Sequence, residues 1–158
     1  MDSSALTKNL IYYIYTKEEA DEVVERLTAH LNSKFSFADT SDSFTNLRPE
    51  VTKLLNDTIT KDMSIEQTKL LVEELKQSLK LPVIHITLSY IPQEKGIEKI
   101  TAKVRQLYGV CLLEFSYDNT LIGGAVIISG GRYHDYSIKR KLQTVFEKYP
   151  EEINKLLV

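Results

Sequence analysis

The chain of 158 residues is short of cysteine and has no long apolar run, and each shortage excludes a class of protein. Its single cysteine, Cys111, cannot form an internal disulfide, and no cysteine or histidine nearby completes a metal motif. The longest apolar runs, such as residues 10–15 and 125–128, are far shorter than the roughly 20 residues that cross a bilayer. We therefore expect Cys111 to be a buried small hydrophobe in a chain that is not itself an integral membrane protein.

An excess of charge of one sign is also lacking. The 20 basic and 22 acidic residues are interleaved along the chain, and the net charge is −2 with an isoelectric point near 5.9. A nucleic acid partner usually demands a basic face, so we expect no such partner. The first residues resemble neither a secretory signal nor an Arg-rich transit peptide, which indicates a cytosol-like compartment.

The first half of the sequence has the pattern of helices. Thr16 to Glu19 and Ser64 to Gln67 each have the form of a capping box, and each precedes apolar residues at three- and four-residue spacing. These patterns predict helices over residues 17–31 and after Ser64, and another after Pro49. The polar stretch over residues 32–50 predicts a loop or a helix boundary. We expect a helical domain over residues 1–80 with three or four helices.

The pattern changes near residue 81. Alternating apolar residues predict a strand over residues 81–92, and three- and four-residue spacing predicts a helix over residues 93–108 that ends at Gly109. Two strands are expected over residues 110–117 and 123–129. A last helix would have its apolar residues on one face, namely Ile138, Leu142, Val145 and Phe146. The fold class is therefore α+β, with an N-terminal helical bundle followed by a small β-α-β-β-α domain over residues 81–158, its helices packed on the sheet.

Four of the six glycines lie within residues 121–142, which raises the question of a phosphate-binding loop. The spacings typical of such loops, GxGxxG and GxxxxGK[ST], do not occur. Gly123 and Gly124 stand at the start of an apolar strand, and Gly130 and Gly131 stand at its end, where they would turn the chain. A side chain at Gly124 is therefore expected to harm folding more than binding.

The polar residues that follow the glycines do not assemble a reaction centre. Asp135 lies at or near the start of the last helix, where a carboxylate accepts the unpaired amide hydrogens, and we interpret it as a capping residue. His134 is its neighbour on an extended chain, so the two side chains would point to opposite faces. His30 and His85 lie in other elements at no metal-ligand spacing. No catalytic residue, metal or cofactor is expected.

The basic cluster of Lys139, Arg140 and Lys141 at the start of the last helix can be read in two ways. It is a candidate docking surface for an acidic partner, or it is the solvated face of the helix. A third use of this region is a small anion- or nucleotide-binding site, built from the Gly130-Gly131 turn with Arg132 and Lys139.

The segment "DNTLIGGAVIISGGRYHDYSIKRKL" resembles the C-terminal signature of the delta subunit of F-type ATP synthase, which is called the oligomycin-sensitivity-conferring protein in mitochondria. The helix and strand that precede it also lie where that family has them, so the resemblance covers residues 81–147. The chain differs from the family in Tyr136, in an N-terminal domain shorter than six helices and in the extension over residues 149–158. The matching positions are Leu121, Ile122, Gly123, Gly124, Asp135, Ser137 and Leu142.

The resemblance implies a non-catalytic subunit of the peripheral stalk, the stator that holds the catalytic head still while the rotor turns. The helical domain would bind the N-terminal tips of the alpha subunits, and the C-terminal domain would meet the b-subunit helices. The protein would then lie on the cytoplasmic face of the cell membrane as part of the complex. An alternative is an E-like stalk protein of V- or A-type ATPases, which also ends in a small α/β domain but begins with a long coiled-coil helix.

Overall fold

A computed structural model describes residues 3–36, 44, 47–59 and 64–150. The chain divides into two compact units, one of residues 1–82 with 110–112 and the other of residues 83–109 with 113–158. Helices form the first unit, and a four-stranded mixed sheet with helices forms the second, which confirms the α+β fold class. Residues 37–43, 45 and 46 of the stretch over residues 32–50, and residues 151–158 of the C-terminal extension, lie outside the described residues.

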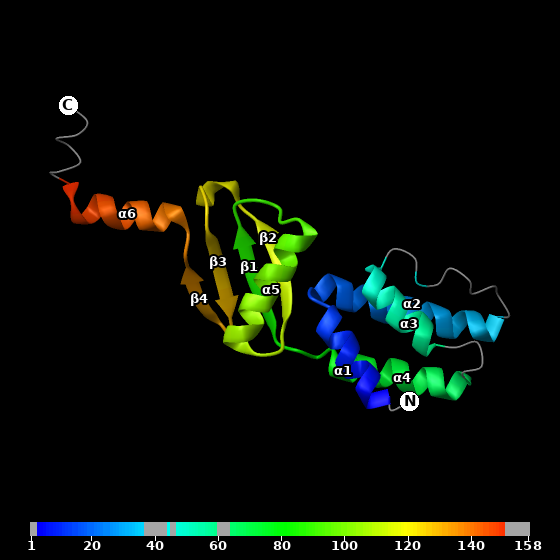
Figure 1. Ribbon diagram of the computed structural model, residues 1–158. Coiled ribbons are helices and arrows are strands. Elements are labelled where there is room, and N and C mark those ends of the chain that lie inside the picture. Colours follow the sequence, from blue (N-terminus) through cyan, green and yellow to red (C-terminus); the bar gives the residue numbers. More distant parts are fainter. Residues whose placement is uncertain (1–2, 37–43, 45–46, 60–63, 151–158) are drawn as a thin grey trace. The chain divides into compact units, whose positions relative to one another are not determined.

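The first unit contains four helices among its described residues: α1 (Ser3–Tyr13), α2 (Lys17–Ser36), α3 (Pro49–Thr58) and α4 (Ile65–Ser78) (Figure 1). Helix α1 packs against α3 and α4, and α2 packs against α4. Two details differ from the sequence prediction. Helix α1 was not predicted, and α2 continues through residues 32–36, where a loop or a helix boundary was expected.

Both predicted capping boxes form. The Glu19 backbone N–H donates to Thr16 Oγ1 at 3.1 Å, and the Thr16 N–H donates to Glu19 Oε2 at 3.2 Å. At the start of α4, the Gln67 N–H donates to Ser64 Oγ at 3.2 Å, and the Ser64 N–H donates to Gln67 Oε1 at 3.0 Å. These reciprocal bonds satisfy amide hydrogens that have no partner within the helix, so they fix where α2 and α4 begin.

Arg48 joins the α1–α2 corner to the start of α3. Its guanidinium donates to Glu19 Oε2 at 3.0 Å and to the backbone oxygen of Tyr13, and it lies 3.8 Å from the ring centroid of Tyr15. The four helices also share an apolar core. The core side chains are Leu10, Ile14, Val23, Leu27, Val51, Leu55, Leu71 and Leu75.

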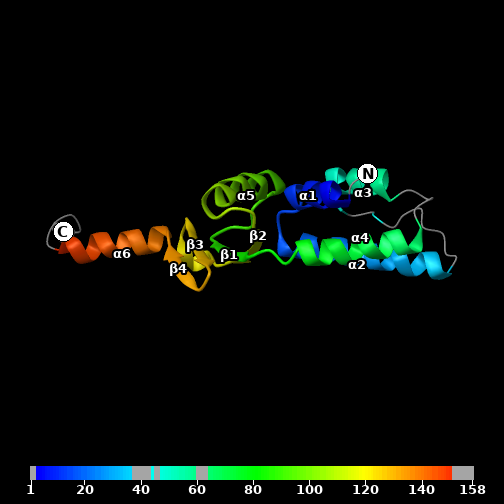
Figure 2. The same cartoon turned by 90° about the horizontal axis from the view of Figure 1, so that it is seen from below.

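The second unit is built on strands β1 (Val83–Leu88), β2 (Leu112–Tyr117), β3 (Ala125–Ser129) and β4 (Arg132–Asp135), in the sheet order β2-β1-β3-β4. The Leu112 N–H donates to Pro82 O, and the Asp118 N–H donates to Leu88 O. These partners advance together along both strands, so β1 and β2 are parallel. Helix α5 (Glu94–Tyr108) is the crossover between them and lies over one face of the sheet (Figure 2).

Strand β3 pairs antiparallel with both β1 and β4. His85 is opposite Ile128, which is opposite Tyr133, so these three side chains share one face of the sheet. On β1, Ile84, Ile86 and Leu88 alternate with them and are buried. Strand β4 was not predicted, so the order of elements is β-α-β-β-β-α, with a short 3-10 helix η1 (Asn119–Leu121) between β2 and β3.

Candidate docking site

The glycines of the signature shape the backbone at two places. Gly130 and Gly131 have φ of +53° and +75° and form the two-residue turn between β3 and β4, which favours glycine because both residues need positive φ. Gly124 has φ of +81° and passes directly against the Tyr136 backbone. The Gly123 carbonyl accepts the Ile138 N–H at 2.9 Å. The Gly123-Gly124 pair therefore holds the start of the last helix.

That helix, α6, spans Ile138–Lys148, and the residue before it is Ser137, which is 1% exposed. The Arg140 N–H donates to Ser137 Oγ at 3.1 Å, so Ser137 is the capping residue. Asp135 stands two residues earlier, and its carboxylate accepts the Ser137 N–H at 2.8 Å. The assignment of the cap to Asp135 is therefore corrected, because Asp135 positions the capping residue instead of capping the helix itself.

The carboxylates beside this junction are held in their charged form. Hydrogen bonds from the Ser137 hydroxyl and N–H lower the pKa of Asp135, with a smaller contribution from Arg140. Hydrogen bonds from the Thr120 hydroxyl and N–H lower the pKa of Asp118, and Lys139 contributes less. The two basic side chains named here belong to the first turn of α6, so the carboxylates complement that turn electrostatically.

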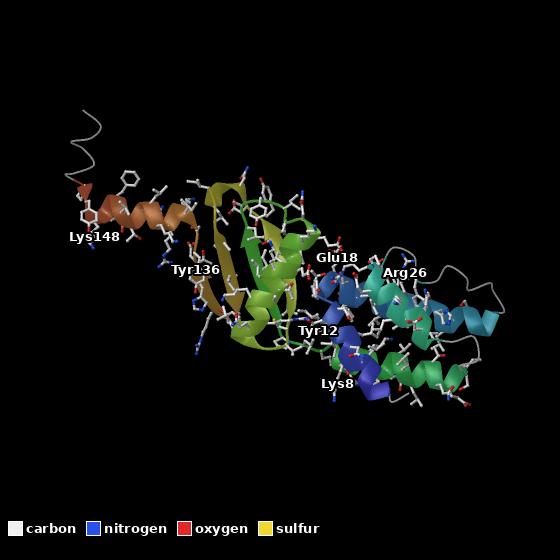
Figure 3. All side chains as sticks on the ribbon, viewed as in Figure 1. Lys8, Tyr12, Glu18, Arg26, Tyr136 and Lys148 are labelled. Atoms are coloured by element: carbon white, nitrogen blue, oxygen red, sulfur yellow. The ribbon has the colours of Figure 1, made fainter. Side chains whose placement is uncertain are left out.

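No residue of α6 is buried. Its apolar side chains, which were expected to pack on the sheet, are between 42% and 53% exposed, and they include the Leu142 of the signature. The helix is attached at its first turn, where Ile138 lies against Gly123 and α6 contacts η1. Figure 3 shows Tyr136 at the β4–α6 junction and Lys148 at the far end of the helix. The exposed apolar residues are Ile138, Leu142, Val145, Phe146 and the following Tyr149.

Lys139, Arg140 and Lys141 are all exposed on α6. Together with Lys148 they give the helix four basic residues against one acidic residue, Glu147. The helix is therefore basic and amphipathic, although the chain as a whole carries a net charge of −2.

Ile122 is the one residue of the signature whose conformation the sequence gives no reason to expect. Its φ is +64° and its ψ is −34°, and no other non-glycine residue in the described part of the chain has positive φ. Its side chain is 67% exposed, whereas the preceding Leu121 is 8% exposed. A β-branched residue avoids positive φ for steric reasons, so this corner is strained.

The structure does not assemble the alternative anion site. Gly130, Gly131 and Arg132 lie at one end of β4, where Arg132 pairs with Ser129, and the chain reaches α6 from the other end, at Asp135. The four residues of an extended strand separate the two ends by about 10 Å, so Lys139 cannot complete a site at the turn.

The histidines are also apart. His30 lies against the ring of Phe44 in the helical unit, and His85 Nδ1 lies 3.0 Å from Glu114 Oε2 on the sheet. His134 stacks on Tyr136 beside β4. Among the described residues, no three His, Cys, Asp or Glu side chains form a group that could hold a metal ion. Cys111 is buried, as expected.

The fold is of the α+β class, and at this site a tethered basic helix exposes its apolar side chains. The chain matches the family described as ATP synthase delta (OSCP) subunit over residues 62–148, more than half of its length, and it belongs to that family. A search of curated proteins finds no significant match.

The family match begins at residue 62 and includes α4, so it reaches further toward the N-terminus than the resemblance over residues 81–147. The family comprises structural subunits of the ATP synthase peripheral stalk, which makes this chain a component of that complex. Within the described residues, no helix combines the length and the apolar character needed to cross a bilayer.

Proposed function

We propose that this chain is the non-catalytic stator subunit that links the catalytic head of an F-type ATP synthase to its b-subunit stalk. The alpha subunits would be its partners in the head, and the complex would place it at the cytoplasmic face of the cell membrane. Such a link needs two separate contact surfaces, because it must resist the torque that the rotor applies to the head. Two compact units, each with its own core, support this assignment.

The observation that carries the proposal is the exposed apolar face of α6. A short helix with no buried residue gains little stability from its own domain, since most helical stability in proteins comes from packing of the apolar face. Apolar side chains at helical spacing are the usual means by which one helix recognises another. In the proposed complex, the b-subunit helices cover this face.

The helical unit would supply the contact with the head. Helix α1 exposes Tyr12, which is 68% accessible, one helical turn from Lys8 (Figure 3). An exposed aromatic side chain is a frequent anchor in protein interfaces. The assignment to alpha subunits comes from the resemblance to the family, and the exposed α1 face supports it.

Copurification tests the proposal directly. The full-length chain, tagged and isolated under mild detergent, is expected to recover ATP synthase alpha and b subunits. Leu142→Glu places a charge in the apolar face and should lose b while retaining alpha. The matched control is Gln143→Glu, which adds the same charge one position away and should keep both. Isolation of the wild-type chain as a monomer with neither subunit would refute the proposed function.

A further inference from the structure

The exposed apolar residues of α6 form one continuous seam. Ile138, Leu142, Val145 and Tyr149 follow one another at spacings of four, three and four residues, and Phe146 lies beside them. This is the spacing at which one helix packs against another in a coiled coil. A partner helix can therefore pack along the seam.

The charges beside the seam select the kind of helix. Lys139, Lys141 and Lys148 flank it, whereas Arg140 and Glu147, the only acidic residue of α6, lie on the opposite face of the helix. A second copy of α6 would bring like charges together, which disfavours pairing between copies. An acidic helix places carboxylates opposite these side chains, and flanking charges of this kind set partner choice in coiled coils.

Ile122 extends this surface beyond the end of the helix. It precedes Gly123, whose carbonyl accepts the Ile138 N–H and whose backbone lies against the Ile138 side chain. Its backbone is strained, and its side chain is 67% exposed, so within its own domain the isoleucine gains no burial to offset the strain. Burial of Ile122 by a partner would explain why an exposed isoleucine occupies this strained conformation.

We propose that the α6 seam and Ile122 together bind a single acidic amphipathic helix, and that Ile122 is a contact residue held in a strained conformation for this purpose. This inference rests on the proposed function in that the acidic helix would belong to the stalk. A residue at position 122 that tolerates positive φ should therefore stabilise the free protein, and the loss of the isoleucine side chain should weaken the complex.

The test uses the full-length chain and a labelled synthetic helix of about four heptads, with Leu at the core positions and Glu at the flanking positions. Fluorescence anisotropy at low salt should show binding of this peptide, and the same peptide with Lys in place of Glu should not bind. Leu142→Glu should weaken binding at least about tenfold, which is about 1.4 kcal/mol. Gln143→Glu should change it by less than about threefold.

Ile122 is tested by two substitutions. Ile122→Asn tolerates positive φ and should raise the melting temperature by about 2–4 °C. The same variant should bind the acidic peptide about tenfold more weakly. Ile122→Val keeps a branched apolar side chain and should retain wild-type affinity. Unchanged affinity in Ile122→Asn, or a lowered melting temperature, would refute the role of Ile122.

Other occupants of the seam give different results. Equal affinity for the Glu and Lys peptides, binding to phosphatidylserine vesicles in place of the Glu peptide, or a dimer in sedimentation at micromolar concentration would each overturn the proposal. If the chain binds the Glu peptide but recovers no ATP synthase subunits, this inference stands and the proposed function fails. The two claims are therefore tested separately.

Discussion

Gly124 provides the sharpest test of how the signature works. Its φ is +81°, and an added Cβ would collide with the backbone oxygen of Tyr136 and lie 3.1 Å from the Cα of Ser137. Gly124→Ala would therefore cost about 1–2 kcal/mol for a side chain in a left-handed conformation. Displacing backbone at the start of α6 would add about 1–3 kcal/mol, as overpacking does in a core.

The matched control is Gly131→Ala. Its φ is +75°, and an added Cβ would meet nothing within 4 Å, so this variant should lose only the about 1–2 kcal/mol of the conformational cost. Urea denaturation followed by circular dichroism measures both losses in the free energy of unfolding. The difference between the variants isolates the close approach of Gly124 to Tyr136. Equal losses in the two variants would refute the reasoning.

Three further predictions concern single side chains. Ser137→Ala should lower the free energy of unfolding by about 0.5–2 kcal/mol in urea denaturation, because it removes the α6 cap. Arg48→Ala should lower the free energy of unfolding by about 1–3 kcal/mol, because it removes charged hydrogen bonds. The partly exposed ion pair of Arg26 with Glu22 is worth only about 0.3–0.5 kcal/mol. A smaller loss of stability in Arg48→Ala than in Arg26→Ala would contradict this view. The pKa of Asp135 is lowered from 3.8 in the folded protein. The charged carboxylate therefore stabilises the fold at pH values above 3.8, and this stabilisation is lost as the pH falls through the folded-state pKa. The stability difference between wild type and Asp135→Asn should therefore be largest at pH 7 and disappear on acidification, and a constant difference would show that the charge is not involved.

The elements that carry local signals could be predicted from the sequence. The capping boxes at Thr16 and Ser64 fixed the starts of α2 and α4, and Gly109 fixed the end of α5, because each uses a side chain or a backbone freedom that acts within a few residues. The alternation of Ile84, Ile86 and Leu88 likewise identified β1 and its buried face.

The missed elements lack such signals. The first helix includes part of the run "LIYYIY", whose β-branched and aromatic residues also suit strands, so α1 depends on its packing against α3 and α4. Strand β4 consists of four polar or aromatic residues, "RYHD", and shows no apolar alternation. Its pairing is imposed by the Gly130-Gly131 turn, which returns the chain alongside β3.

The candidate site was predicted in composition but not in arrangement. The sequence identified the basic cluster and the apolar residues of α6, yet amphipathicity alone cannot tell whether a helix packs on its own sheet or on another protein. The cap was assigned to Asp135, but Ser137 stands two residues later and its side chain also accepts an amide hydrogen, so the local pattern did not identify Ser137 as the cap. The positive φ of Ile122 contradicts its local preference, so only the surrounding structure reveals it.

We infer that this chain holds the catalytic head of ATP synthase to its stalk. This is tested by proton-driven ATP synthesis in membranes from cells that lack the chain, together with the amount of ATP-hydrolysing head that stays on those membranes. We expect that synthesis is lost, that the head is released, and that the wild-type chain restores synthesis and head binding while Leu142→Glu does not. Unchanged synthesis with the head still bound would contradict this inference.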